Sequence, residues 1–291
     1  MSLVRRWSRV RRVGHAGTLD PAASGILLVC LGQGTRVVEF LSSMTKAYWA
    51  RIELGIATDT YDAQGKVTQR GDPSSVDREQ MHSLLNSFLG CIEQVPPMFS
   101  AIKRAGTPLY RLARSGIVVE RRSRKVEIYG ISLLEWEPPL LTIGVECSKG
   151  TYIRSLAHDI GQTLGCGAHL KNLVRWRSGP FHIQDSVTLP KLEAAIGYEG
   201  WQRLLHPLDT ALLDKLAAIV GKDREKVIVS GQSLSLGGTA MEEPSPTGEK
   251  WCRAYSMEGK IVALLRLEQD GMLWHPKKVF AGGPLSSASN S

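Results

Sequence analysis

One acidic residue lies in a loop whose composition could expose it for chemistry. Asp20 is the sole carboxylate in residues 14–27, a stretch interrupted by glycines and by Pro21. Proline disfavours a helical conformation in the residue before it, so Asp20 should be extended or in a turn. The apolar residues 26–31 predict a buried strand, and loops held by a rigid strand often carry catalytic groups. A catalytic carboxylate fits this layout, although Asp-Pro between glycines is also ordinary turn chemistry.

The composition favours a globular protein that binds a polyanion. The chain has 291 residues, and 43% of them are hydrophobic, which is enough for a large core. The formal net charge of +8 favours nucleic acid, because clustered Lys and Arg displace counterions from phosphates. The five cysteines are scattered without a Cys-x-x-Cys pair, which predicts reduced thiols in a cytoplasmic protein. We find no metal-binding spacing and no apolar run long enough for a membrane span.

Two segments are rich in basic residues. Residues 3–13 predict a helix with apolar side chains on one side and most of its arginines on the other; the arginines are at positions 5, 6, 9, 11 and 12. A solvated charged face and a phosphate-contacting surface explain this helix about equally well. In residues 96–124, prolines and basic side chains surround a predicted short helix that contains Tyr110. Aromatic residues among basic ones suit a segment that grips RNA.

The central elements should place further polar residues near Asp20. Residues 46–56 alternate as a strand that puts Tyr48 on the apolar face, where a core tyrosine is the simplest interpretation. Residues 34–41, 77–89 and 151–164 predict helices, 126–136 and 140–147 predict strands, and 170–183 predict a helix followed by a strand. Thr151 is expected to cap its helix. Arg154 falls in the first turn, where the helix dipole disfavours a cation, so we expect a carboxylate partner.

The character of the sequence changes near residue 209. Residues 210–221 predict a helix, and residues 226–229, 252–256, 261–267 and 273–280 predict the strands of a small β unit. We therefore divide the chain into domains at 1–209 and 210–280, with 237–250 as a polar insertion. Residues 281–291 predict a disordered tail.

Residues 14–27 resemble the Gly-His-x-Gly-Thr-Leu-Asp-Pro-x-Ala-x-Gly-x-Leu signature of the TruB-type tRNA pseudouridine synthases, a long and specific motif. The similarity continues through Lys46-Ala47-Tyr48 and residues 58–62, 94–103 and 147–154, and covers most of residues 4–182. The opening strand of that family has no counterpart before residue 3, which we expect to affect the adjoining sheet edge. Phe99 stands where a tyrosine is common.

The resemblance implies a fold and a reaction. The fold would be α+β, a mixed and mostly antiparallel sheet flanked by helices, with a small β-rich PUA-like C-terminal domain and a thumb at residues 96–124. The reaction would convert uridine 55 in the T arm of tRNA to pseudouridine, breaking the N1–C1′ bond and rejoining the base through C5. It would need no cofactor. The enzyme would be a stand-alone monomer that needs no obligate protein partner and does not bind a membrane.

The resemblance also implies roles for individual residues. Asp20 would attack C1′ or assist loss of a sugar proton, and Arg154 would keep it ionised and oriented. Tyr48 would stack on the flipped uracil, and its hydroxyl could transfer a proton only if the pocket lowers a pKa that is ~10 in water. The remaining residues that the family pattern places at the substrate are His15, Asp62, Lys103, Tyr152, Leu173 and Arg175.

Two other functions remain open. The chain could be an RNA chaperone or a particle subunit in which catalysis is incidental or lost. It could also resemble the guide-RNA-dependent synthases of archaea and eukaryotes. The intact Asp20, Tyr48 and Arg154 favour an enzyme, and the thumb-like segment favours the stand-alone bacterial form.

Overall fold

The computed structural model describes residues 1–197, 200–236, 249–268 and 271–280. These residues form two compact units. Residues 17–28 and 41–186 form the first, which we call the sheet unit. Residues 1–16, 29–40 and those from 187 onward form the second, which we call the C-terminal unit. No helix among the described residues is long and apolar enough to cross a membrane.

A seven-stranded sheet forms the centre of the sheet unit. Its strands run in the order β13-β12-β4-β11-β10-β7, and β2 pairs with β12. The pairings are antiparallel except for the parallel pairing of β2 with β12. The strands are β2 (Ala23–Gly25), β4 (Lys46–Leu54), β7 (Gly90–Gln94), β10 (Arg124–Glu137), β11 (Leu140–Cys147), β12 (Ala168–Ser178) and β13 (Phe181–His182).

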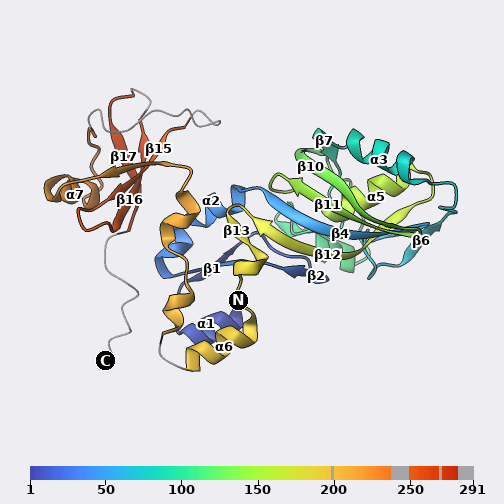
Figure 1. Cartoon of the computed structure of the whole chain (residues 1–291), viewed down its shortest axis with the longest axis horizontal. Coiled ribbons are helices and arrows are strands. Elements are labelled where there is room, and N and C mark those ends of the chain that lie inside the picture. The colour runs from blue at the N-terminus through green and yellow to red at the C-terminus, as the bar shows by residue number, and fades with distance from the viewer. Residues whose placement is uncertain (198–199, 237–248, 269–270, 281–291) are drawn as a thin grey trace. The chain divides into compact units, whose positions relative to one another are not determined.

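Alternation along the central strands explains where the core lies. In β4, Ala50, Ile52 and Leu54 are buried, whereas Trp49 on the opposite face is exposed. Helices α3 (Arg78–Ser87) and α5 (Ile153–Thr163) cover the apolar face (Figure 1). The apolar side chains of α5, spaced as one helical stripe, pack there with those of β4 and β11. Tyr48 lies on this same covered face and packs against the core.

Smaller elements complete the sheet unit. They are β5 (Ile56–Thr58), β6 (Val67–Arg70), β8 (Lys103–Arg104), β9 (Thr107–Pro108), α4 (Leu109–Arg114) and the short 3-10 helix η2 (Ile183–Asp185). The pairs β5-β6 and β8-β9 are two-stranded and antiparallel. The predicted thumb at residues 96–124 therefore consists of a hairpin and one short helix.

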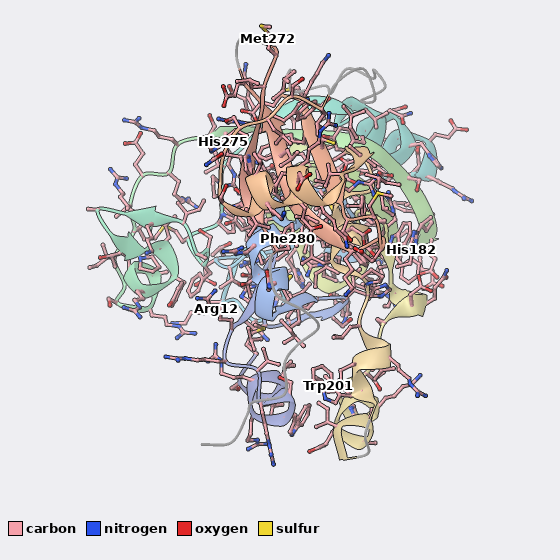
Figure 2. All side chains as sticks on the ribbon, turned by 90° about the vertical axis from the view of Figure 1, so that its left-hand side faces the viewer. Arg12, His182, Trp201, Met272, His275 and Phe280 are labelled. Atoms are coloured by element: carbon pink, nitrogen blue, oxygen red, sulfur yellow. The ribbon has the colours of Figure 1, made fainter. Side chains whose placement is uncertain are left out.

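The C-terminal unit contains a second sheet with its own core. Strands β14 (Leu216–Ile219), β15 (Trp251–Tyr255), β16 (Ile261–Leu267) and β17 (Trp274–Val279) follow one another in that order. Helix α7 (Lys222–Val229) buries Ile228 in this core together with Leu265 and Trp274. Met272 stands at the outer end of the loop before β17 (Figure 2).

The remaining elements of this unit are short. They are α1 (Ser2–Ser8), β1 (Val13–Ala16), β3 (Leu28–Leu31), η1 (Gly32–Val37), α6 (Leu189–Gly197), η3 (Trp201–Leu204) and η4 (Leu208–Leu212), with α2 (Val38–Ser43) as a connecting helix. Arg9 ends α1 because its φ of 56° is left-handed, so the predicted helix over residues 3–13 is too long. The arginines at positions 5, 6, 9, 11 and 12 are all exposed.

The predicted fold class is confirmed, and several local predictions are wrong. Residues 168–178 form one continuous strand rather than the predicted helix-to-strand segment. Residues 210–221 contain the end of η4 and strand β14, not a helix, because β14 pairs with β15. Residues 226–229 end α7: Val227-Ile228-Val229 favours a strand, but burial of one helical face overrides that propensity. The Thr151 hydroxyl donates to the Ser148 carbonyl and does not cap α5.

The compact units are assembled differently from the predicted domains. The first 16 residues and residues 29–40 group with the C-terminal unit, so the chain passes between units more than once. Contact in space rather than position in sequence determines this grouping. The division at residue 209 therefore stays a prediction about family domains. The predicted tail at 281–291 and most of the insertion at 237–250 lie outside the described residues.

Replacing Gly25 by alanine should weaken the attachment of the Asp20 loop to the sheet. Gly25 has a φ of 101°, and an added Cβ would lie 2.2 Å from the Arg175 carbonyl oxygen. We expect a loss of at least about 3 kcal/mol in unfolding free energy, measured by urea titration.

Gly165→Ala is the matched control. Its φ of 75° is equally left-handed, but no atom lies within 4 Å of the added Cβ. It should cost only about 1 kcal/mol. Equal losses for the two variants would show that the close approach at Gly25 does not matter.

Candidate active site

The side chains of Asp20 and Arg154 form a paired contact. Arg154 Nε donates to Asp20 Oδ2 at 2.8 Å, and Nη2 donates to Oδ1 at 2.9 Å. The Arg154 side chain is only 4% exposed, whereas the Asp20 side chain is 35% exposed. Two parallel charge-assisted hydrogen bonds fix the orientation of a carboxylate as well as its position. The expected carboxylate partner of Arg154 is thus Asp20, and it still faces solvent.

Arg154 also contacts two other segments of the sheet unit. Its Nη2 donates to the Phe99 carbonyl oxygen at 2.9 Å, and its Nη1 donates to the Thr60 carbonyl oxygen at 3.3 Å. The same Nη1 lies 3.5 Å from Asp62 Oδ2. All three nitrogens of the buried guanidinium therefore have partners, as a buried charge requires.

The loop that carries Asp20 is fastened to β12. Strand β2, which follows Asp20, pairs with Leu173, Val174 and Arg175 in parallel. Arg175 is 2% exposed and donates from Nε to the Ile26 carbonyl and from Nη2 to the Gly17 carbonyl, both at 2.9 Å. Arg175 therefore holds both ends of the loop. The role of Arg175 in binding substrate stays a prediction; in this structure its guanidinium is buried and anchors the loop through these two backbone carbonyls.

A second loop, residues 58–65, positions Asp62. The Thr60 hydroxyl donates to Asp62 Oδ1 at 2.6 Å, and the Gln64 amide donates to the same oxygen at 3.0 Å. Asp59 accepts from the Lys66 amide at 2.8 Å. The side chains of Asp59 and Asp62 therefore both stabilise the turn of this loop. Asp62 uses one oxygen for its own loop and presents the other to Arg154.

A pocket opens beside the carboxylates. Asp20, Asp62 and Arg154 line it on one side. Its apolar wall comes from Ala22, Ala23, Leu170 and Leu173, the last of which is a predicted wall residue. The site is therefore a shallow, partly apolar recess next to an oriented carboxylate that still faces solvent, an arrangement in which a substrate can meet a reactive group.

Tyr48 lies directly across the strand pair from Arg175. Burial raises the pKa of Tyr48 to about 12, and the hydrogen bond from Arg175 offsets only part of this effect. The charge of Asp20 also raises the pKa of Tyr48, by a smaller effect than burial. The condition under which Tyr48 could accept a proton, a lowered pKa, is therefore not met. The Tyr48 hydroxyl is a neutral donor in this site.

Two buried cations lie beneath the Asp20 loop. Lys46 is 5% exposed, and its Nζ donates to the carbonyls of Ser42 and Met44 at 2.7 and 2.5 Å. Burial lowers the pKa of Lys46 to about 8, and the charge of Arg175 lowers it further. An added Cβ at Gly17 would lie 3.3 Å from Arg175 Nη1 and 3.8 Å from Lys46 Cε. The loop thus rests on both cationic side chains.

The other predicted site residues are not among those that line the pocket. Tyr152 precedes α5, and the Arg124 guanidinium lies 4.6 Å from the centre of its ring. Lys103 is exposed on β8 in the thumb. His15 belongs to the C-terminal unit. The structure brings together Asp20, Tyr48, Asp62, Arg154, Leu173 and Arg175 within the sheet unit, and the roles of Tyr152, Lys103 and His15 stay predictions.

Sequence reasoning missed two supporting residues. Gln94 is fully buried, accepts from the Tyr152 amide at 2.7 Å and donates to the Tyr152 carbonyl at 3.0 Å, which fixes the start of α5. Lys46 was noted only as part of a motif. Gln94 had one signal in the sequence, its position as a polar residue shortly before Pro96-Pro97. The burial of Lys46 had one signal, since Lys46 and Tyr48 share a face of the predicted strand.

Both the sequence and the fold match known proteins. The profile of the TruB family pseudouridylate synthase N-terminal domain matches residues 5–153, and that of the tRNA pseudouridylate synthase B C-terminal domain matches residues 154–213. The tRNA pseudouridine synthase B of Dehalococcoides mccartyi is 44% identical over 277 residues, 95% of this chain and 90% of that protein. That of Symbiobacterium thermophilum is 46% identical over 238 residues, 81% of this chain and 75% of that protein.

Two of the solved structures with a similar fold are complexes. A chain in a Cbf5-Nop10-Gar1 complex has a TM-score of 0.73 and 28% identity, covering 96% of this chain and 79% of that chain. A chain in an H/ACA RNP bound to a substrate RNA containing 2′-deoxyuridine has a TM-score of 0.72 and 26% identity, covering 97% and 80%.

Replacing Lys46 by methionine should remove a pH dependence from the folding stability. The folded pKa of Lys46 is about 8 against an ordinary 10.5, so between these values the unfolded chain binds more protons. Stability rises with pH wherever the unfolded state binds more protons. The unfolding free energy of the wild type relative to Lys46→Met should therefore increase from about pH 8 to about pH 10 in urea titrations.

The exposed Lys66 provides the control. The same comparison with Lys66→Met should show no such increase, because its side chain is in water in both the folded and the unfolded chain. A flat difference for Lys46→Met as well would contradict the assignment of a buried, destabilised cation.

Proposed function

The chain belongs to the TruB family of pseudouridylate synthases, and we propose that it isomerises uridine 55 in the T arm of tRNA to pseudouridine. The observation that supports this proposal most directly is the Asp20–Arg154 pair at the edge of a partly apolar pocket. The reaction breaks the N1–C1′ bond of the nucleotide and rejoins the uracil through C5. It needs an oriented carboxylate near C1′ and a recess that retains the free base.

The geometry supports a proposed role for each central residue. Asp20 faces the pocket and would attack C1′ or remove a sugar proton. Arg154 stays buried and holds both oxygens of Asp20, so it acts on orientation rather than on the substrate. With its pKa raised to about 12, Tyr48 would provide its ring face and a neutral hydroxyl to the uracil. The apolar wall at Leu173 would exclude water from the base.

The enzyme can reach the target uridine only after the base has left the RNA stack. A base inside folded RNA must be flipped out, which costs a few kcal/mol of stacking that protein contacts must replace. The thumb at residues 96–124 offers exposed cations for this purpose, including Lys103 and Arg122. Arg121 differs from its neighbour, because it is half-buried and its Nη1 donates to the Pro96 carbonyl at 3.1 Å. Arg122 rather than Arg121 is the better phosphate-contacting residue.

A particle subunit is the second candidate function. It is favoured by the fact that the similar solved structures are complexes that contain Nop10 and Gar1 or an H/ACA RNP. Against it, the chain aligns over most of its length with bacterial tRNA pseudouridine synthase B proteins. We propose a stand-alone cytoplasmic enzyme that needs no obligate protein partner.

Tritium release from unmodified tRNA labelled with [5-³H]uridine tests the reaction and its position together. The purified chain alone should release tritium from the wild-type transcript and not from one in which uridine 55 is replaced by cytidine. Asp20→Asn should abolish release, because it removes the reactive carboxylate but keeps the size of the side chain. Its affinity for tRNA should stay within about threefold, since the change is local and isosteric.

The outcomes separate the candidate functions. Tight tRNA binding without tritium release would favour the particle subunit or a chaperone. Release from the cytidine-55 transcript would place the target elsewhere. Active Asp20→Asn would remove this carboxylate from the mechanism.

Replacing Lys103 and Arg122 together by alanine should reduce the salt dependence of tRNA binding. Each phosphate contact contributes about 0.7 to 0.9 to the slope of log affinity against log salt concentration. We expect the slope to fall by about 1.5 in filter-binding titrations, if both residues contact phosphates. The exposed Lys66 and Arg78, outside the thumb, provide a double-alanine control of equal charge change. An equal fall in the control would show that only the net charge matters.

A further inference from the structure

We propose that His158 is a positioning residue for the reaction: its ring stacks on Tyr61 and thereby fixes the loop that presents Thr60 and Asp62 to Arg154. The inference rests on the proposed function, because it concerns the same site. It adds to the Asp20–Arg154 pair a contact between α5 and the loop of residues 58–65 that positions the other partners of Arg154.

The geometry places the stack directly behind the catalytic pair. The rings of Tyr61 and His158 are 3.9 Å apart at their centres, with an interplanar angle of 12°. His158 follows Arg154 by four residues on α5, so both side chains leave the same face of that helix. Tyr61 lies between the Thr60 carbonyl and the Asp62 carboxylate, and both of these contact Arg154. One helix face therefore contacts three consecutive residues of the loop.

Two locally unfavourable features meet at this contact. Tyr61 has a φ of 64°, a left-handed conformation that is rare for a bulky aromatic residue. His158 Nδ1 is buried and has no hydrogen-bond partner among the described residues. Such features persist where the surrounding structure determines them, and they concentrate at functional sites. Both features belong to the two residues of the stack, the left-handed backbone to Tyr61 and the unpaired nitrogen to His158.

The left-handed conformation of Tyr61 has a specific consequence for the site. The Tyr61 amide donates to Thr58, and the Tyr61 carbonyl accepts from the Leu170 amide at 3.0 Å. The chain therefore reverses at Tyr61, which turns the Thr60 carbonyl and the Asp62 side chain toward the same guanidinium. Loss of the stack would allow the loop to relax to a right-handed turn and would move these two acceptors.

The surroundings favour a neutral ring at this position. Burial lowers the pKa of His158, and the charge of Arg121 lowers it further. A neutral imidazole can lie flat on Tyr61 without adding another cation near Arg154. An aromatic hydrocarbon ring should therefore serve the same purpose, and this expectation makes the inference testable by substitution.

A direct contact of Tyr61 with RNA is the competing explanation, because the Tyr61 side chain is only half-buried. The two explanations differ in what they predict. A positioning role should lower the rate of the bound complex and leave tRNA affinity unchanged. A contact role should weaken binding first.

The experiment measures single-turnover tritium release with excess enzyme, and the dissociation constant for the same tRNA by filter binding. His158→Ala and Tyr61→Gly should each lower the single-turnover rate by about 10- to 100-fold, since small misplacements of catalytic groups have effects of this size. Glycine accepts the φ of Tyr61, so Tyr61→Gly removes the ring without the strain. Both dissociation constants should stay within about twofold of the wild type.

Rescue distinguishes stacking from a general structural effect. His158→Phe keeps a flat ring and should restore the rate to within about threefold of the wild type. His82→Ala, an exposed histidine on α3, is the matched control and should leave the rate unchanged. If His158→Phe is as slow as His158→Ala, although its thermal unfolding midpoint is unchanged, the stacking role is wrong.

An Asp62→Asn background tests whether the effect passes through the loop. If His158 acts by placing Asp62, His158→Ala should lower the single-turnover rate much less in the Asp62→Asn variant than in the wild type. Such non-additivity is expected of two residues that act through the same contact. Full additivity would overturn the inference, and so would a raised dissociation constant with an unchanged rate. Failure of the wild type itself to release tritium would instead contradict the proposed function, so the two failures can be told apart.

Discussion

The buried guanidinium of Arg154 is the constraint on which the site depends. A cation that is 4% exposed cannot remain without partners, because the loss of hydration is large unless carboxylates and carbonyls replace water. Its partners come from three loops that are remote in sequence, at Asp20, at Thr60 with Asp62, and at Phe99. Helix α5 fixes the arginine, and the arginine in turn fixes the loops. In the proposed mechanism, the reactive carboxylate of Asp20 is thus held by a group that does not itself touch the substrate.

Arg175 fastens the same loop in a different way. Two of its hydrogen bonds go to the carbonyls of Gly17 and Ile26, on either side of Asp20. Because it neutralises no carboxylate there, it restrains the backbone and leaves Asp20 to Arg154 and the pocket. The β12 strand has an irregular register between Arg175 and Arg177, and such bulges redirect side chains at functional sites. The sheet therefore supplies both the wall of the pocket and the anchor of its loop.

The sequence predicts regular features better than contacts. Alternation places Tyr48 correctly, and the dipole argument gives Arg154 a carboxylate partner, because both depend on local geometry. The β12 strand is not predicted, since Lys171, Arg175 and Arg177 interrupt its apolar pattern and their burial or pairing depends on distant partners. Helix α7 is missed because Val227-Ile228-Val229 favours a strand, and only packing decides otherwise. Arg175 as a backbone anchor could not be predicted, because its partners lie about 150 residues earlier in the chain.

The charges around the pocket suggest why buried cations are tolerated beneath it. Asp20 and Asp62 place two negative charges beside the pocket, where they would repel the phosphates of a bound RNA strand. Arg154 offsets one of them, and Lys46 and Arg175, at the base of the loop, more than offset the other while Lys46 is protonated. Both are too buried to bind a phosphate directly. Their field is weakly screened inside the protein, so in the proposed reaction they would reduce the repulsion between Asp20 and a polyanionic substrate without competing for Asp20.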